Sequence, residues 1–333
     1  MRSGGVLSSN PEMTVIPVPK ANFTGALGDR LASVLIRGSA FLAILSLILI
    51  FVFIGKEALP ILTSPEIQKE ASLSTLFLPH PAKPGARTEY TWQPVSEVPK
   101  YSILPLFVGT LKVTIIAVLF AIPLAVAAAL YTSEFAHPWV REVVKPAIEL
   151  LAGIPSVVIG FFCLMVLAAW LHNAFGWTYR LNAITAGLGL SLAVIPIVYT
   201  VAEDAFSSVP QAFREGSLAM GASSWQTAWR VVLPAAMPGV LAACVLGFGR
   251  AIGETMIVLM ASGNAAVLSL SPTDSIRTFS ATIAAELGEV VVGSAHYHVL
   301  FFLGASLFIL TFVLNLFGHW WVGRLQKKLQ GAS

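Results

Sequence analysis

Long apolar runs alternate with shorter polar segments along most of the chain. Six of them have roughly twenty residues or more, the length that an α-helix needs to cross a ~30 Å hydrocarbon core. They lie at about 33–55, 104–131, 148–172, 183–203, 233–262 and 298–322. In a bilayer each segment must satisfy its own backbone N–H and C=O groups, which a helix does. The pattern therefore predicts an all-α fold, a polytopic membrane bundle of six transmembrane helices.

The composition excludes several other classes of protein. Charged residues make up 11% of the 333 residues, less than half of the usual share in a soluble domain, which is about 25%. A net charge of +3 on so apolar a chain provides no basic face for nucleic acid. The two cysteines, Cys163 and Cys244, lie inside apolar runs and suggest neither a disulfide framework nor a zinc site. His296 and His298 have no carboxylate or cysteine beside them in the sequence, so we expect no bound metal.

The polar segments between the runs suggest a topology. Lys and Arg gather at one set of span ends, whereas the short loops at the other set carry only Arg180 and Arg277. The positive-inside rule then places both termini in the cytoplasm. The first run is too long for a signal peptide, and we interpret it as an uncleaved span. We expect a cytoplasmic tail at 1–32, a first helix at 33–55, an extracytoplasmic loop at 56–103, a transmembrane core at 104–325 and a cytoplasmic tail at 326–333.

Helix-breaking residues stand inside several of the predicted spans. Proline removes one helical hydrogen bond, and a span that must open toward two sides can use such a position as a hinge. The hinge candidates are Gly153, Pro155 and Pro196. A plain packing kink is the more frequent role of such residues, because Pro and Gly are common in transmembrane helices.

The longest inner loop, at about 205–232, has the pattern of two short helices that meet at a turn. Gly221 suits the end of the first helix, because glycine adopts the left-handed conformation there. Ser223 or Ser224 then suits the cap of the second. From shape alone, an amphipathic helix on the membrane surface, anchored by Trp225 and Trp229, explains the loop equally well.

Two charges stand in the middle of the fifth run. Arg250 and Glu254 are four residues apart, so on a helix they share one face and can pair. Charges near the bilayer centre cost at least about 2.5–3.5 kcal/mol and usually line a polar pathway. We therefore predict a substrate pathway at Arg250 and Glu254, with Gly249, Gly253 and Thr255 beside them. A structural ion pair is the alternative.

Further charged residues, outside the loop and the fifth span, need a separate interpretation. Glu149 follows Lys145 by four residues, and we expect these two to pair. Glu203 and Asp204, at the end of the fourth span, suggest a solvated edge. Lys112, near the start of the second span, has no explanation from the sequence.

The inner loop resembles a signature of permease subunits of bacterial ABC importers. In this signature E-A-A is followed by three residues, a glycine, nine residues and I-x-L-P. Here Glu215, Gly221, Leu233 and Pro234 are in register, while Gly216 and Ser217 replace the alanines and Val231 replaces the isoleucine. The resemblance implies a coupling helix that docks on an ATP-binding subunit. The residues that it assigns to this contact are Arg214, Glu215, Gly216, Ser217, Gly221, Leu233 and Pro234.

Span five, with G-R-A-x-G-E-T-M at 249–256, is similar to the phosphate-specific permeases of the Pst system. So are the segments 151–158 and 108–111, and the 56–103 loop with Trp92-x-Pro94 is more similar to the PstC than to the PstA subunit. The resemblance, over residues 30–325, implies a type I ABC importer permease of the MetI-like fold that carries inorganic phosphate across the lipid bilayer of the bacterial inner membrane. It implies a PstA-like second permease, two copies of a PstB-like ATP-binding subunit and an extracytoplasmic PstS-like phosphate-binding protein.

No phosphate-binding loop of the type G-x-x-x-x-G-K-[ST] occurs in the sequence. We therefore expect a non-catalytic subunit without a cofactor of its own, with ATP and Mg²⁺ bound in the partner subunits. Two alternatives stay open. In the first, the chain is an ABC permease for another oxyanion, such as sulfate, molybdate or phosphonate. In the second, it is a membrane signalling scaffold that transports nothing.

Overall fold

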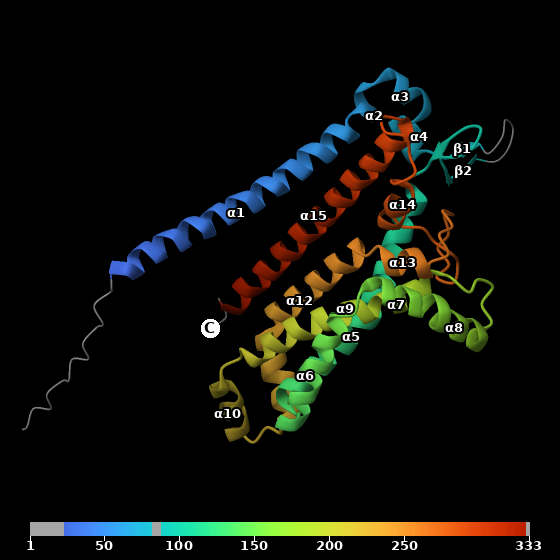
Figure 1. Cartoon of the computed structure of the whole chain (residues 1–333). Coiled ribbons are helices and arrows are strands. Elements are labelled where there is room, and N and C mark those ends of the chain that lie inside the picture. The colour runs from blue at the N-terminus through green and yellow to red at the C-terminus, as the bar shows by residue number, and fades with distance from the viewer. Residues whose placement is uncertain (1–22, 82–87, 331–333) are drawn as a thin grey trace, which may run out of the picture. The chain divides into compact units, whose positions relative to one another are not determined.

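A computed structural model describes residues 23–81 and 88–330. Most of the predicted N-terminal tail (1–22) therefore lies outside the described residues, as do the last three residues of the C-terminal tail (331–333). The chain divides into two units, 1–53 and 54–333. The described part of the first unit is the helix α1 (Phe23–Ala58) up to Phe53. The second unit holds every other element (Figure 1).

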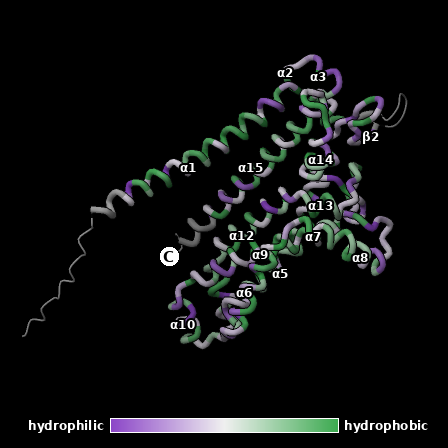
Figure 2. Tube along the Cα trace, viewed as in Figure 1, coloured by the Kyte–Doolittle hydropathy of each residue, from purple (hydrophilic) through white to green (hydrophobic). Residues whose placement is uncertain are grey.

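Six helical segments of the described chain are long and apolar enough to cross a membrane. They run over Gly28–Thr63, Leu104–Glu134, Ser156–Phe175, Ala183–Ser207, Ser224–Gly253 and Ala295–Arg324, where hydrophobic residues predominate (Figure 2). The predicted number of spans is confirmed, but two boundaries were wrong. The third span begins at Ser156 rather than at 148, and the fifth occupies 224–253 rather than 233–262.

Three helices form the centre of the second unit: α5 (Leu104–Glu134), α9 (Ala183–Ser207) and α12 (Leu233–Gly253). On α5 a buried stripe of alanines recurs every fourth residue, at Ala117, Ala121, Ala125 and Ala129. Small residues let helix backbones approach closely, which supplies much of the packing energy inside a membrane. At the crossing of α12 and α9, a Cβ on Gly247 would collide with the side chain of Val198. Helix α15 (Ala295–Gln330) packs against α12.

The third span is built from several pieces. Helix α6 (Pro138–Ala152) precedes it and has no buried residue. The span itself consists of α7 (Ser156–Phe162), a π-helical turn (Cys163–Leu167) and α8 (Ala168–Phe175). Gly153 and Pro155 fall in the break between α6 and α7, because Gly153 ends the first helix and Pro155 begins the second. Pro196, by contrast, lies inside the continuous helix α9.

Residues 59–103 and the segment before α15 form a cap at one end of the bundle. The elements of residues 59–103 are α2 (Pro60–Thr63), α3 (Pro65–Glu70), α4 (Leu73–Phe77) and the short antiparallel pairs β1 (His80–Pro81) with β2 (Thr88–Glu89) and β3 (Trp92–Gln93) with β4 (Lys100–Tyr101). The cap shares a second apolar core with the outer ends of the helices, which includes Leu76, Trp92, Tyr101, Phe279 and Leu300. The predicted 56–103 loop is therefore packed onto the bundle.

Candidate functional site

The loop at 205–232, called the coupling loop below after its predicted role, folds as two helices that meet at Gly221. Helix α10 (Gln211–Ala219) is followed by a turn in which Gly221 has a φ of +84°, and α11 (Ser224–Thr227) begins the long span. Only glycine adopts this conformation without strain. Ser223 caps α11, because its hydroxyl accepts the Gln226 N–H at 3.2 Å while the Gln226 side chain accepts the Ser223 N–H at 2.9 Å. The turn glycine and a serine cap, both predicted from the sequence, are confirmed.

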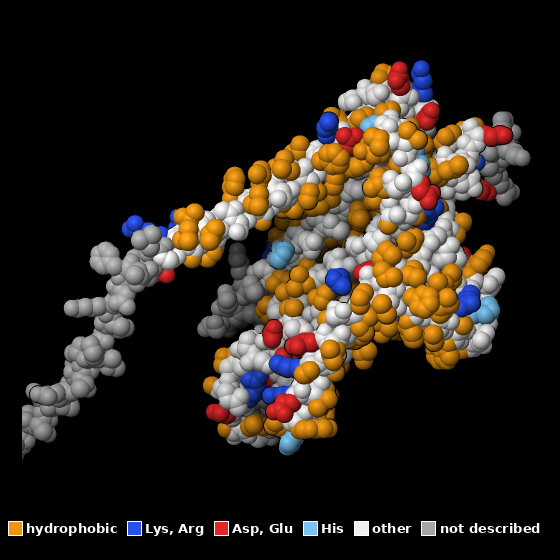
Figure 3. Space-filling view, in the orientation of Figure 1, with side chains coloured by type: hydrophobic (Ala, Val, Ile, Leu, Met, Phe, Trp, Pro, Cys, Tyr) orange, Lys and Arg blue, Asp and Glu red, His pale blue; other side chains and the backbone are white. Residues whose placement is uncertain are grey.

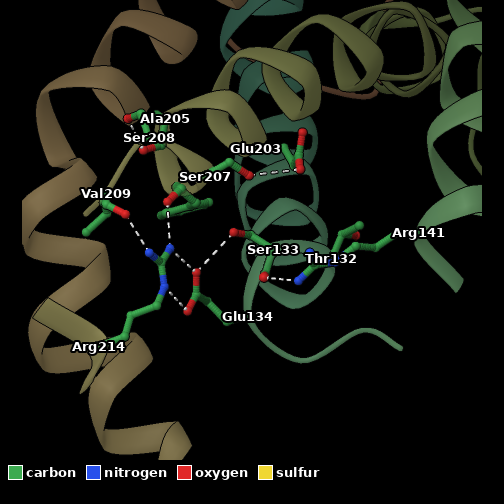
Figure 4. A network of polar contacts seen from close by, with 11 residues as sticks. Thr132, Ser133, Glu134, Arg141, Glu203, Ala205, Ser207, Ser208, Val209 and Arg214 are labelled. Atoms are coloured by element: carbon green, nitrogen blue, oxygen red, sulfur yellow. Dashed lines mark hydrogen bonds and ion pairs between the residues drawn. The ribbon is translucent and has the colours of Figure 1, made fainter. Parts of the chain in front are cut away.

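The loop is tied to the rest of the bundle by Arg214. Its guanidinium pairs with Glu134 at the end of α5, with N–O distances of 2.7 and 3.0 Å, and donates to the carbonyl oxygens of Phe206 and Val209 (Figure 4). The hydrogen bond to Glu134 raises the pKa of Arg214. Arg214 is therefore turned inward, and its side chain lies apart from the exposed surface of the loop.

Several large apolar side chains of the loop are exposed beside polar ones such as Glu215 and Arg230. Phe213, Leu218, Met220, Trp225 and Trp229 all expose about half or more of their surface. A hydrogen bond of 2.9 Å between the hydroxyls of Ser217 and Thr227 joins the two helices of the loop. Large apolar surfaces of this kind mark contacts with a partner or a membrane.

The seven predicted coupling residues fall into two groups. Those on the exposed side are Glu215, Gly216, Gly221 and Pro234. Those held by contacts within the chain are Arg214, Ser217 and Leu233. Pro234 follows a π-helical turn (Ala228–Val232), where the Leu233 N–H bonds to the Ala228 carbonyl. The wider turn fits a residue that has no N–H to donate.

The fifth span is interrupted where the two charges stand. Helix α12 ends at Gly253, Glu254 has extended backbone, and a short helix α13 (Met256–Ala261) follows. The Glu254 carboxylate accepts the Met256 N–H at 3.2 Å, and its carbonyl accepts the Ser280 hydroxyl at 2.8 Å. Ser280 belongs to α14 (Phe279–Glu286), which faces the break. These bonds fix the broken chain in place.

The expected pair between Arg250 and Glu254 was wrong. Among the described residues no carboxylate lies within ion-pair distance of Arg250, and its side chain is exposed. The reason is the end of α12 at Gly253, because two residues share a helix face at this spacing only while the helix continues between them.

The end of α12, before the break, lies beside the last span. A Cβ on Gly249 would touch Asn315, in the middle of α15, at 3.4 Å, which places this part of α12 level with the middle of the last span. Gly253 has open space around it, and the Thr255 hydroxyl donates to the Gly253 carbonyl at 3.3 Å. The predicted pathway residues thus lie at and just before the end of α12, and the Arg250 guanidinium among them has no carboxylate partner in the part of the chain that the structure describes.

Three other charged residues have surroundings that the sequence did not predict. Lys145 pairs with Glu203 at 2.8 Å rather than with Glu149, and this hydrogen bond raises the pKa of Lys145. Glu203 is 4% exposed, so the predicted solvated edge was wrong for it. Lys112 donates to the carbonyl oxygens of Ser269 and Ser271, which explains a polar residue at that position. The spacing of residues along one helix cannot predict contacts with segments that are distant in the sequence.

At the capped end, the Glu286 carboxylate joins three segments. It accepts from Trp92 Nε1 at 3.1 Å, pairs with Arg277 at 2.5 Å and contacts His296 at 2.9 Å. A carboxylate therefore does stand beside His296, contrary to the interpretation from sequence. Among the residues that the structure describes, however, no group of three His, Cys, Asp or Glu side chains could hold a metal ion.

Known proteins resemble this chain in both sequence and fold. Residues 121–331 match the family model of the binding-protein-dependent transport system inner membrane component. The chain belongs to this family. It is 39% identical to the probable ABC transporter permease protein YqgH of Bacillus subtilis over 69% of this chain and 74% of that protein. Its identity with the phosphate transport system permease protein PstC 1 of Mycobacterium tuberculosis is 36%, over 68% and 74% of the two chains.

The phosphate transport system permease protein PstC of Mesorhizobium japonicum is 32% identical, over 72% of this chain and 79% of that protein. Among solved structures, the bacterial ABC transporter involved in alginate import superposes with a TM-score of 0.59 at 17% identity, over 90% of this chain and 99% of that chain. The inward-facing MetNI methionine ABC transporter gives a TM-score of 0.51 at 18% identity, over 67% and 94%. The fold is therefore that of MetI-like ABC importer permeases, and the chain is a multi-pass inner membrane protein.

Proposed function

We propose that this chain is the PstC-type permease subunit of an ATP-driven importer of inorganic phosphate. The observation that carries this proposal is the exposed guanidinium of Arg250, which has no carboxylate partner among the described residues and lies three residues before the break at which α12 ends. An arginine without a carboxylate near the end of a membrane-spanning helix is costly unless it meets an anion or water on a pathway. The planar guanidinium presents donors in a fork that matches two oxygens of a phosphate. The likeness to several proteins named PstC supports the same substrate.

The surroundings of Arg250 suit a small anion that binds briefly. Gly253 leaves open space, and Thr255 brings a hydroxyl next to the break. Glu254 lies at the same break with its carboxylate engaged only by the Met256 N–H. A carboxylate close to the path weakens anion binding, so that phosphate is released rather than retained. It also accepts a hydrogen bond from the P–OH group of hydrogen phosphate, which sulfate cannot donate.

The coupling loop supplies the link to ATP. Its exposed apolar side, which includes Phe213, Met220 and Trp225, is suited to a cleft in an ATP-binding subunit. Arg214 connects the loop to Glu134, the last residue of α5, so a push on the loop moves α5 and the end of α9 together. In this proposal the chain carries out no covalent chemistry. Two PstB-like subunits hydrolyse ATP, and the bundle alternates between inward-facing and outward-facing states.

The remaining partners follow from the same assembly. A PstA-like permease completes the pathway, and a PstS-like protein delivers phosphate at the capped end. We infer that the coupling loop and both termini face the cytoplasm, since Lys and Arg gather on that side. Cysteine in place of Ser74, in the cap, should react with a membrane-impermeant thiol reagent from outside, whereas cysteine in place of Ser223 should react only after permeabilisation. The reverse pattern contradicts this orientation.

Phosphate uptake by proteoliposomes that contain all four components tests the proposed substrate. We expect ATP-dependent uptake of phosphate that arsenate inhibits and that sulfate, molybdate and phosphonates leave unchanged. Stronger inhibition by one of these other oxyanions would assign the importer to that anion. Complete absence of uptake, with intact assembly, would favour a signalling scaffold.

A further inference from the structure

The capped end of the bundle exposes apolar side chains outside every membrane-spanning segment. Val95 and Val98 lie in the turn between β3 and β4 and are 94% and 72% exposed. Val291 and Val292, between α14 and α15, are 77% and 79% exposed. Figure 3 shows that, on one face, charged side chains also gather over α2 to α4 of the cap. Single exposed valines need no explanation, but valines that line one cleft, as Val95 and Val291 do and Val98 and Val292 do not, mark a contact with another protein.

The two valine-bearing segments are held together rather than loosely attached. Trp92, at the start of the β3–β4 hairpin, donates its indole N–H to Glu286 at the end of α14. Glu286 is held in turn by Arg277 and His296. The rings of Trp92, Tyr101 and His296 pack against one another with centroids 5.7–6.3 Å apart. The surface is therefore pre-organised, which lowers the entropy lost when a partner binds.

Between the two segments lies a cleft of about 490 Å³. Its walls are formed by Pro94, Val95, Glu286, Glu289, Val290, Val291, Ser294 and His296. Glu286 already has cationic and N–H partners, but Glu289 is exposed and its carboxylate meets no cation among the described residues. The cleft thus combines apolar walls with one unsatisfied negative charge at its rim.

We propose that this cleft docks the extracytoplasmic binding protein and receives a basic side chain flanked by apolar residues from its surface. The inference rests on the proposed function, which requires such a protein at the end opposite the coupling loop. Position supports it, because α5 runs from the cap at Leu104 to the coupling loop at Glu134 (Figure 1). Charge supports it as well, because a free carboxylate beside apolar walls attracts Lys or Arg and repels anionic lipid headgroups.

The apolar walls and the charge of the cleft contribute differently to binding of the partner. Valine contacts that exclude water supply affinity at the centre of the patch. The rim charge of Glu289 mainly raises the rate of encounter, so its contribution falls as salt is added. The Glu286 cluster holds the two walls in position, and Glu286 and His296 also line the cleft.

The test is a titration of the reconstituted four-component complex with the phosphate-loaded binding protein, with ATP hydrolysis as the readout. Glu289→Lys should raise the half-saturating concentration about tenfold, or 1.4 kcal/mol, and remove most of its salt dependence. Val95→Asp and Val291→Asp should each raise it about tenfold. Basal ATP hydrolysis without the binding protein should stay unchanged, because these side chains are exposed and lie far from the coupling loop.

Matched controls come from the same turn. Glu97→Lys and Val98→Asp make the same changes at exposed positions that do not line the cleft, and both should leave the titration unchanged. Equal titrations for cleft and control variants would overturn the docking site. If the wild-type complex responds to the binding protein but moves no phosphate, the proposed function fails, whereas the docking site is still decided by the variants.

Discussion

Two arginines of this chain occupy opposite situations, one in the coupling loop and one near the end of α12. Arg214 is held by the Glu134 carboxylate and by two main-chain carbonyls. Arg250 is exposed and has no carboxylate partner among the described residues. Sequence spacing suggests the reverse, because only Arg250 has a carboxylate one helical turn away. The difference separates a residue that holds the structure together from one that is left available for a ligand.

The largest effect is expected from breaking the engaged pair. Glu134→Gln leaves the Arg214 guanidinium largely buried without its carboxylate, which should cost about 3 kcal/mol of stability. We expect a clearly lower midpoint of thermal unfolding of the purified complex, together with weaker coupling of ATP hydrolysis to uptake. Glu142→Gln, at an exposed position of α6, is the matched control. Equal midpoints for the two variants would show that the Arg214 contact is not structural.

A smaller effect is expected at the turn of the coupling loop. Gly221→Leu places a side chain at a φ of +84°, which costs about 1–2 kcal/mol. Nothing lies within 4 Å of the added Cβ in this chain, so the strain is in the backbone and the bulk faces the docking side. The variant should insert normally but lose phosphate uptake. Normal uptake at normal expression contradicts the docking role of the loop.

The ion pair between Lys145 of α6 and Glu203 of α9 should contribute still less to stability. The Lys145 side chain is 46% exposed, so solvent screens the pair and Lys145→Met should cost about 0.5 kcal/mol. The raised pKa of Lys145 means that its contribution is complete below the ordinary value of 10.5 and is lost as the pH rises through the raised value. The difference in unfolding midpoint between variant and wild type should therefore persist at neutral pH and disappear above about pH 10.5. A difference that disappears near neutral pH contradicts this assignment.

Glu254→Gln should have almost no effect on stability. The amide oxygen still accepts the Met256 N–H, and no buried cation loses its partner. We expect an unchanged unfolding midpoint, assembly and basal ATP hydrolysis, but reduced phosphate uptake. A large loss of stability would return Glu254 to a structural role.

How far the sequence predicts this molecule depends on whether a feature is local. The six spans, the turn at Gly221 and the cap at Ser223 follow from periodicity and residue preference within a few positions. The pairings of Arg214 and Lys145 do not, because each joins elements that lie 58 or more residues apart, as from Lys145 to Glu203. The Glu286 cluster escaped prediction for the same reason, since Trp92 meets it across 194 residues. The break at Glu254 could have been suspected from Gly253, the last residue of α12.

The central claim is that Arg250 meets the transported anion, and phosphate uptake by the double variant Arg250→Met with Glu254→Leu tests it most directly. Arg250 has no carboxylate partner among the described residues, so if it does not meet the anion, its replacement by an apolar residue should leave transport normal. Our account predicts a complex that inserts, assembles and hydrolyses ATP at its basal rate but carries no phosphate. Arg250→Lys should also lose most of the uptake, because an ammonium lacks the planar fork. Robust phosphate uptake by the double apolar variant would contradict the account.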